Sequence, residues 1–302
     1  MLFRYGLLKA GGFASGTKLR QKYELGRFLA KGGTSAIFEI VDQTDATVKK
    51  VAKIQLLEGY EIMIFKEEGL LHELSGNPGF PNYYDSFNQN GFNFIITDHV
   101  GIAIDPILRG KADQKFSKDS LVKIGMKICE ALNYLHSLGW LHRDVHTGNI
   151  MAKLNENQKL VITLIDFGLA TSINPPPLCY KMHSLHASLH VCQGLRYRPI
   201  DDFYSLIFSL IRCSGEKPFG TIKDGMDAKI QIECKEKFHA DPLLCFQNPN
   251  SVWLGELYKQ LNCLEGNTDL SSITKMFEEI VPGLTQHSDI EYEILNDCVS
   301  IK

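Results

Sequence analysis

The sequence contains two short motifs, His142-Arg143-Asp144-Val145-His146-Thr147-Gly148-Asn149 and, seventeen residues after Asn149, Asp166-Phe167-Gly168. Three of their side chains carry useful chemistry. The carboxylate of Asp144 could take the proton of an acceptor hydroxyl. Asn149 and Asp166 supply the oxygen atoms that a magnesium ion prefers. The spacing of the motifs is specific, and it predicts a phosphoryl-transfer site in which Asp144 is the base and Asn149 and Asp166 bind metal.

The length and composition are those of an ordinary globular protein. At 302 residues the chain is long enough for two lobes with a sizeable core. Hydrophobic residues make up 44% and charged residues 22%, which leaves no reason to expect a disordered or fibrous chain. The formal net charge of -3 and the pI near 6.4 argue against a surface for nucleic acid or anionic membrane. We therefore expect neither nucleic acid nor membrane among the partners.

The cysteine pattern and the first residues predict an intracellular location. The eight cysteines are scattered and include no C-x-x-C pair, which is typical of reduced thiols. No apolar run approaches the roughly 18 residues that a membrane helix needs. Residues 1–16 lack the long apolar stretch of a secretory signal. A cytoplasmic or nuclear protein is the expectation.

Strand-like segments come first and helical patterns dominate later, which predicts an α+β fold with a small β-rich N-lobe and a larger helical C-lobe. Residues 1–22 are expected to be an extension without regular structure, because of Gly11, Gly12 and Gly16. The expected strands are Tyr23–Leu29, Ala36–Val41, Thr47–Ile54, Phe92–Asp98 and Val161–Ile165. The expected helices are Ile62–Leu74, a helix that Ser117 caps and that reaches Leu138 before Gly139, and then Asp202–Cys213, Ser251–Asn262 and Asp269–Ile280. The predicted domain covers residues 23–282, with an N-lobe at about 23–98, a boundary near 98–102, a C-lobe at about 103–282 and a tail at 283–302.

The third expected strand contains Val51-Ala52-Lys53, and a lysine in this context pairs with the α- and β-phosphates of a nucleotide. Such a lysine needs a carboxylate from the next helix to orient it. Glu67 is the better candidate and Glu68 the rival, because Glu67 leaves the apolar residues 70 and 71 on the inward face.

The segment expected to cover the phosphates is degraded. It reads Ala30-Lys31-Gly32-Gly33-Thr34-Ser35-Ala36-Ile37, where the usual pattern is G-x-G-x-x-G-x-V. Glycine lets backbone N–H groups approach a phosphate closely, so alanine and serine should stiffen or displace this loop. We nevertheless assign the nucleotide-binding role to Ala30, Gly32, Gly33, Ser35 and Ile37.

These motifs together resemble those of the eukaryotic protein kinases. The resemblance implies a two-lobed kinase fold, the cofactors ATP and Mg2+, and phosphorylation of a protein substrate on serine or threonine. It implies that Thr97 is the gatekeeper and that Asp98 and Val100 belong to the hinge. It also implies that Ile37, Ala52 and Met151 enclose the adenine. Arg143 would meet an ordered or phosphorylated activation segment.

Within this superfamily the chain is similar to the casein kinase 1 group, whose close kin are the vaccinia-related and tau-tubulin kinases. Gly79-Phe80-Pro81 resembles the G-I-P of that group, and Ala187-Ser188 followed by Asp201-Asp202 replaces the usual A-P-E triplet. Two positions depart from the pattern. His146 stands where most serine/threonine kinases have a lysine on the γ-phosphate. Pro199-Ile200 replaces two arginines that lie beside the substrate groove in that group. The preference of the group for acidic, pre-phosphorylated substrates depends on these arginines. It would be kept here only if Arg196 and Arg198 substitute for them.

Three alternatives remain open. The degraded loop and His146 would also suit a pseudokinase that acts as a nucleotide-binding scaffold. The string H-x-D-x-H-x-G-N is similar to that of small-molecule phosphotransferases, although the long segment from Leu169 to Pro199 favours a protein substrate. A zinc site is conceivable at His183, His186, His190 and Cys192, although their spacing matches no closed zinc module. No pattern in the sequence indicates an oligomeric state.

Overall fold

The computed structural model describes residues 13–33, 35–174, 184–219, 227–264, 272–295 and 298–302. The chain divides into two compact units, Met1–Val100 and Gly101–Lys302. Gly101 opens the second unit with a φ of 96°, and a Cβ at this position would overlap the backbone of Ala152. Only glycine therefore fits where the second unit begins.

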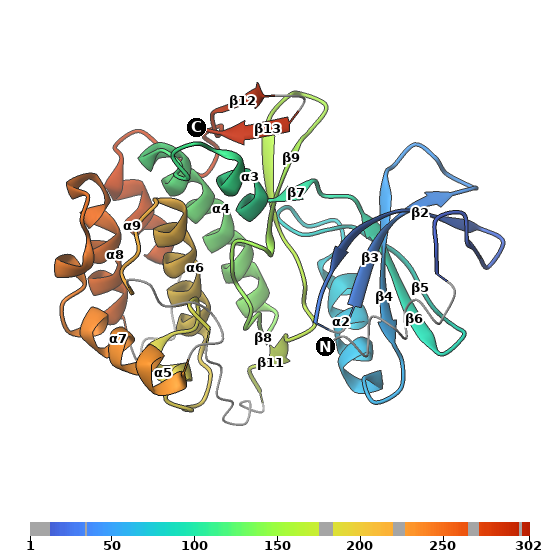
Figure 1. The fold of residues 1–302 in the computed structure, drawn as a ribbon, viewed down its shortest axis with the longest axis horizontal. Helices are drawn as coiled ribbons and strands as arrows, with labels where there is room; N and C mark the ends of the chain where they lie inside the picture. Colours follow the sequence, from blue (N-terminus) through green and yellow to red (C-terminus); the bar gives the residue numbers. More distant parts are fainter. Residues whose placement is uncertain (1–12, 34, 175–183, 220–226, 265–271, 296–297) are drawn as a thin grey trace. The chain divides into compact units, whose positions relative to one another are not determined.

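The first unit is an antiparallel sheet with one described helix, α2 (Glu61–Leu74), beside it (Figure 1). The strands lie in the order β1-β2-β3-β4-β6-β5. Their bounds are β1 (Lys18–Leu19), β2 (Tyr23–Lys31), β3 (Ser35–Asp42), β4 (Lys50–Leu56), β5 (Tyr83–Gln89) and β6 (Phe92–Asp98). Alternate side chains point to opposite faces, so each strand divides its residues between an apolar core and the face that carries Lys53.

The expectation that residues 1–22 lack regular structure is wrong for the part that the structure describes. Strand β1 pairs with β2, with Leu19 opposite Tyr23, and Leu19 is fully buried. Phe13 packs edge-on against Phe92, with ring centroids 5.0 Å apart. Phe13 and Leu19 thus join this segment to the sheet, because burying apolar side chains is favourable.

The second unit is mainly helical (Figure 1). Its helices are α3 (Ile104–Gly110), α4 (Lys118–Ser137), α5 (Leu189–Cys192), α6 (Pro199–Cys213), α7 (Ala228–Ala240), α8 (Val252–Asn262) and α9 (Ser272–Ile280), with short 3-10 turns at Pro242–Cys245 and Pro249–Ser251. Its strands are β7 (Ile102–Ala103), β8 (Trp140–Leu141), β9 (Ile150–Leu154), β10 (Leu160–Leu164), β11 (Thr171–Ser172), β12 (Tyr292–Leu295) and β13 (Cys298–Ile301). They pair as a three-stranded sheet β10-β9-β7 and as the two-stranded ribbons β11-β8 and β12-β13.

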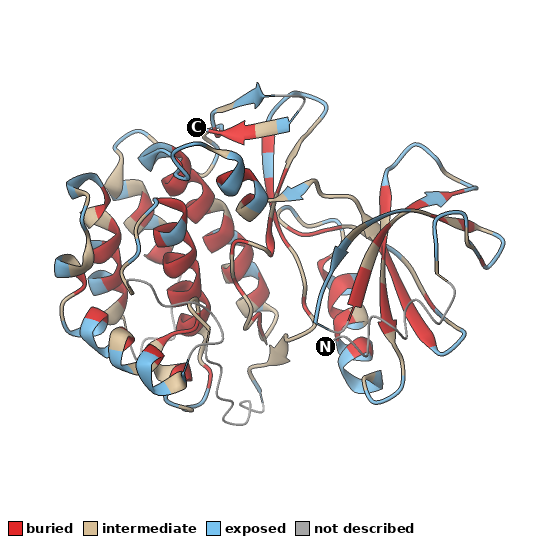
Figure 2. Ribbon diagram, viewed as in Figure 1, coloured by how far each residue is buried: buried red, intermediate tan, exposed pale blue. Residues whose placement is uncertain are grey.

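Helices α4 and α6 form the centre of this unit, and both are buried along most of their length (Figure 2). The hydroxyl of Ser117 accepts the N–H of Ser120, so the predicted cap of α4 is confirmed. Gly139 follows the helix with a φ of 82°, as its role as a terminator requires. Helix α6 begins at Pro199, three residues before the predicted start, because proline suits the first helical position and the Asp201 carboxylate accepts the backbone N–H of Arg198 at 2.7 Å.

Other elements also differ from the predictions. Strand β4 begins at Lys50 rather than Thr47, because the Asp45 carboxylate holds Thr47 in a turn through its N–H and its hydroxyl. Helix α7 and strand β5 are not among the predicted elements. The last predicted helix is described only from Ser272, since residues 265–271 lie outside the described ranges.

The C-terminal residues are part of the second unit rather than a loose tail. Strands β12 and β13 form a hairpin, and Ile290 and Ile301 belong to the main apolar core. The carbonyl of Lys302 accepts the N–H of Ser117, the residue that caps α4. The end of the chain therefore supports the start of a central helix.

Candidate active site

One buried carboxylate on α6 holds the loop that contains Asp144. Asp202 is fully buried and accepts the backbone N–H groups of His142 at 2.9 Å and Arg143 at 2.8 Å. His136 and Tyr197 donate to the same carboxylate, each at 2.8 Å. Burial raises the pKa of Asp202, but the bonds from His136 and the nearby His142 outweigh it, so the pKa is lowered and the group is ionised. The loop is thus fixed through its main chain.

His142 connects this loop to the segment of Asp166. Its Nδ1 accepts the N–H of Asp144 at 3.2 Å, and its Nε2 donates to the carbonyl of Ile165 at 3.2 Å. These two bonds require a neutral ring, and burial lowers the pKa of His142 accordingly. Asp166 follows with a φ of 67°, a left-handed conformation that is rare for aspartate. A strained backbone held in place by its surroundings is typical of a functional position.

The β9–β10 hairpin brings the two predicted metal ligands to the same end of a ribbon. Ile150 pairs with Leu164, and the N–H of Ile165 donates to the carbonyl of Asn149 at 2.9 Å. Asn149 is therefore hydrogen-bonded directly to the residue that precedes Asp166. The side-chain nitrogen of Asn149 donates to the carbonyl of Asp144 at 2.9 Å and to its carboxylate at 3.1 Å, which leaves the amide oxygen for a cation. An amide oxygen and a carboxylate are both ligands that Mg2+ accepts.

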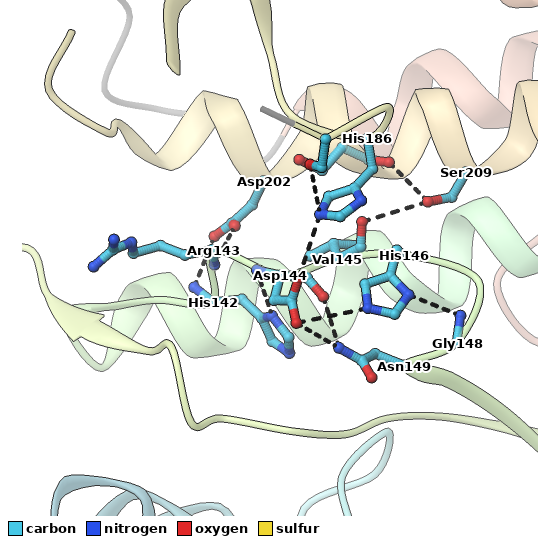
Figure 3. A network of polar contacts seen from close by, with 12 residues as sticks. His142, Arg143, Asp144, Val145, His146, Gly148, Asn149, His186, Asp202 and Ser209 are labelled. Atoms are coloured by element: carbon cyan, nitrogen blue, oxygen red, sulfur yellow. Dashed lines mark hydrogen bonds and ion pairs between the residues drawn. The ribbon is translucent and has the colours of Figure 1, made fainter. Parts of the chain in front are cut away.

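Two histidines flank the carboxylate of Asp144 (Figure 3). The Nε2 of His146, from the same loop, lies 3.6 Å from Oδ2. The Nε2 of His186, from the segment that precedes α5, lies 3.3 Å from Oδ1. The two ring centroids are 5.0 Å apart. The structure thus assembles Asp144, Asn149 and both histidines into one cluster, of which the sequence motif predicted all but His186.

Hydrogen bonding defines the protonation of this cluster. The Nδ1 of His146 accepts the N–H of Gly148 at 2.9 Å, so the hydrogen of the neutral ring is on Nε2, toward Asp144. Burial lowers the pKa of His146, but the carboxylates of Asp144 and Asp166 outweigh it and raise the pKa overall. Burial dominates at His186 and lowers its pKa. Burial alone would raise the pKa of Asp144, but the bonds from the two histidines hold it well below the usual range, and Asp144 is ionised.

The first unit contains the predicted lysine–glutamate pair. The Nζ of Lys53 on β4 lies 2.5 Å from the Oε1 of Glu67 on α2, and both side chains are largely buried. Glu68, the rival, instead accepts the hydroxyl of Ser86. The choice between the two glutamates follows from the helix, since neighbouring residues point in directions about 100° apart.

The predicted phosphate loop is the turn between β2 and β3. Ala30 pairs with Ile37, and the N–H of Gly32 donates to the carbonyl of Ser35 at 2.9 Å. Ser35 is buried, and its hydroxyl occupies the space that a side chain at position 32 would need. Gly33 lies within the described turn, whereas Thr34 lies outside the described residues.

The structure places one predicted adenine contact, Ala52, away from the face that carries Lys53. Ala52 is fully buried and pairs with Phe38 and Ile96 in the apolar core of the sheet, on the face opposite Lys53. The alternation of a strand instead puts Val51, two residues before Lys53, on the face that carries the lysine. Val51 is half-buried and pairs with Thr97. The two-residue alternation of a strand, applied to Val51-Ala52-Lys53, would have identified Val51 as the residue on the same face as Lys53.

The remaining predicted positions lie at or near the ends of strands. Thr97 and Asp98 end β6, and the Asp98 carboxylate accepts the N–H of Asn82 at 2.7 Å. Val100 is the last residue of the first unit. Met151 lies on β9 of the second unit, opposite Thr163, and is half-buried.

Comparison with known families agrees with this geometry. A family model for the protein kinase domain matches residues 23–277. The chain belongs to the protein kinase family. The predicted resemblance to kinases and the predicted fold class are both confirmed.

Individual relatives of this kinase are distant. A probable serine/threonine-protein kinase from Dictyostelium discoideum is 26% identical and aligns over 83% of this chain and 52% of its own length, so the chain spans about half of that relative. A putative casein kinase I from Caenorhabditis elegans is 23% identical over 95% of this chain and 81% of its own. The solved structure of vaccinia related kinase 3 shares the fold, with a TM-score of 0.70 at 17% identity over 89% of this chain and 90% of that one.

The zinc interpretation finds no support in the described part of the kinase. His183 lies outside the described residues. His186 contacts Asp144, and His190 contacts the carbonyl of Arg196 at 2.8 Å. Within the described ranges, no group of three or more histidine, cysteine or acidic residues is arranged to hold a metal ion.

The same ranges contain no helix with both the length and the apolar character to cross a membrane.

Proposed function

We propose that the chain is an ATP-dependent serine/threonine protein kinase. The observation that carries this proposal is the state of Asp144, an ionised carboxylate flanked by two histidines and bonded to Asn149. A carboxylate in this state can accept the proton of a serine or threonine hydroxyl as that oxygen attacks phosphorus. The relatives named as serine/threonine kinases support the same activity.

The other residues would supply binding and charge. The amide oxygen of Asn149 and the carboxylate of Asp166 would hold Mg2+, which when bound neutralises charge on the β- and γ-phosphates. Lys53, kept in place by Glu67, would bind the α- and β-phosphates. Gly32, Gly33, Ser35 and Ala30 would cover the phosphates, and Ile37, Val51 and Met151 would contact the adenine. Phosphoryl transfer depends mainly on positioning and electrostatic stabilisation, so these groups account for most of the expected acceleration.

We also propose a casein kinase 1-like protein substrate. The group's two arginines are absent, and Arg198 is engaged by Asp201, with 3.2 Å between Nη2 and Oδ1. Arg196, by contrast, has an exposed side chain near α6. An acidic or phosphorylated residue in the substrate would therefore meet Arg196. Its replacement by alanine should lower kcat/KM for a pre-phosphorylated peptide more than for the same peptide without phosphate.

The activity is tested by removing one essential charge at a time. Lys53→Met and Asp166→Asn should each lower kcat by at least about 10^3, because the lost electrostatic terms act in the transition state. Radiolabelled phosphate transfer to a generic protein substrate measures the effect. Lys49→Met is the matched control, since Lys49 is exposed just before the same strand, and it should retain parental activity.

Two outcomes would contradict this assignment. Retention of more than about a tenth of the parental rate in either variant would mean that the roles are wrong. A parent protein that binds Mg-ATP but transfers no phosphate would instead favour the pseudokinase alternative.

A further inference from the structure

Helix α7 contains a buried cation. Lys235 is 2% exposed, and its ammonium group lies 4.1 Å from the ring centroid of Phe208 and 4.8 Å from that of Phe219. Aromatic faces stabilise a desolvated ammonium group, but a buried charge remains costly unless hydrogen bonds satisfy it. The ammonium group of Lys235 therefore needs hydrogen-bond acceptors.

The ammonium group binds two backbone carbonyls of the segment that precedes α5. Its Nζ donates to the carbonyl of Leu185 at 2.8 Å and to that of Ala187 at 2.5 Å. The residue between these two is His186. Charged donors make short, strong hydrogen bonds, so the backbone on both sides of His186 is held by one side chain.

The other side of this segment is anchored to α6. The hydroxyl of Ser188 donates to the carboxylate of Asp201 at 2.7 Å, and both residues are buried. Fixed between Lys235 and Asp201, the backbone directs the imidazole of His186 to within 3.3 Å of Asp144 (Figure 3). A continuous series of contacts thus runs from α7 through His186 to the predicted base.

We propose that Lys235 is a positioning residue for phosphoryl transfer, which holds His186 against the carboxylate of Asp144. The proposal rests on the proposed function of Asp144 as the base. It follows from the geometry, because the lysine grips the two peptide groups that set the direction of the histidine. A residue that served stability alone could be replaced by an apolar side chain of similar length among the same aromatic rings.

A double-mutant cycle in the full chain tests the kinetic part. Lys235→Met should lower kcat by about tenfold to a hundredfold with little change in KM for ATP, since small displacements of a catalytic group have effects of this size. His186→Ala should lower kcat to a similar extent. The double variant should be no slower than His186→Ala, because both changes remove the same contact. Additive losses would overturn the proposal.

Lys127→Met is the matched control. Lys127 also donates to a backbone carbonyl, that of Gln286 at 3.1 Å, but it lies on α4 and grips a different segment. Its replacement should leave kcat at the parental value. A loss equal to that of Lys235→Met would show a general effect of lysine removal and would overturn the proposal.

A spectroscopic measurement tests the contact without any turnover. In protein labelled with 15N histidine, Asp144→Asn should shift the ring signals of His186. The same change in a Lys235→Met background should shift them little. An equal shift in both backgrounds would overturn the proposal. This measurement needs no phosphoryl transfer. If the parent protein transfers no phosphate but shows the expected shifts, the proposed function is contradicted, whereas the contact between Lys235, His186 and Asp144 is supported.

A second variant covers the case in which Lys235→Met does not fold. Lys235→Arg keeps the charge but displaces the donors, because the guanidinium is longer and planar. In this variant kcat and the response of His186 to Asp144→Asn should change together or not at all. A change in one without the other would overturn the proposal.

Discussion

Among single residues, Asp202 shows how much one buried carboxylate can organise. It accepts two consecutive main-chain N–H groups of the loop that contains Asp144 and two side-chain donors, and it is fully buried. Removal of such a partner leaves several buried donors unsatisfied, which costs more than the bonds themselves contribute. The geometry of Asp144 therefore depends on a residue 58 positions later in the sequence.

The grouping of the candidate site residues was predictable, because phosphoryl-transfer chemistry restricts both their type and their spacing. Asp144, Asn149 and Asp166 lie in fixed motifs, and the lysine–glutamate pair needs only a strand and a helix. His186 and Lys235 were not predictable in their roles. Their contacts depend on how residues 42 and 91 positions beyond Asp144 fold back, and no local pattern encodes this.

His146 provides a test of charge at the active site. His146→Lys should raise kcat at pH 8 by about threefold to thirtyfold, with a gain that shrinks toward pH 6. The carboxylates around His146 raise its pKa, so the ring is charged below that pKa and loses its charge as pH rises through it, whereas lysine stays charged. Two charges about 4 Å apart interact by roughly 4 kcal/mol at an effective dielectric of 20, of which only the part that grows in the transition state counts.

The measurement is kcat from pH 6 to 8.5 at saturating Mg-ATP, with His146→Gln as the uncharged control. A constant ratio of lysine variant to parent would show that protonation of His146 is irrelevant. A lower kcat at every pH would mean that the bond from Gly148 to the histidine ring is the important feature, since lysine cannot accept it.

Among secondary-structure elements, helices α2, α4, α6 and α8 and strands β2, β3, β4 and β6 were predictable from the period of their apolar residues and from their caps. Helix α4 begins after its predicted serine and ends before its predicted glycine. Helix α7 escaped prediction because its buried positions include Gln231 and Lys235, which a hydrophobicity pattern counts as polar. Strand β5 escaped prediction for the same reason, because most of its residues are polar. Tertiary contacts, rather than local preference, decide such elements.

Two glycines within helices should respond oppositely to alanine. A Cβ at Gly69 of α2 would have no neighbour within 4 Å, so Gly69→Ala should raise the free energy of unfolding by up to about 1 kcal/mol through helix propensity. A Cβ at Gly125 of α4 would overlap the ring of Phe277 on α9. Gly125→Ala should therefore lower the free energy of unfolding by about 1–3 kcal/mol despite the same propensity gain. Urea unfolding of both variants beside the parent measures this, and stabilisation by Gly125→Ala would refute the α4–α9 packing.

At the level of the full chain, the two units and their order were predictable, but the role of the C-terminal residues was not. The hairpin of β12 and β13 has mostly half-buried or exposed residues, so it carries only a weak pattern. Its buried residues make sense only once α3 and α4 are in place beside it. A segment that looks like a tail in the sequence thus completes the second unit.

The hairpin supplies its own matched pair of substitutions. Ile301 on β13 is fully buried, and Ile301→Ala should cost about 2–5 kcal/mol of stability. Ile294 on β12 is 51% exposed, and Ile294→Ala should stay within about 0.5 kcal/mol of the parent. Thermal or denaturant unfolding distinguishes them. Equal, small effects would show that the hairpin does not contribute to the core.

The crowding around Asp144 has a consequence for the geometry of the reaction. An ionised carboxylate offers about four lone-pair positions. The Asn149 amide takes one, and the imidazoles of His186 and His146 face two more. About one position is left for an incoming alcohol, whose hydrogen must point at it. A base at this position would therefore fix the direction from which a substrate hydroxyl can approach.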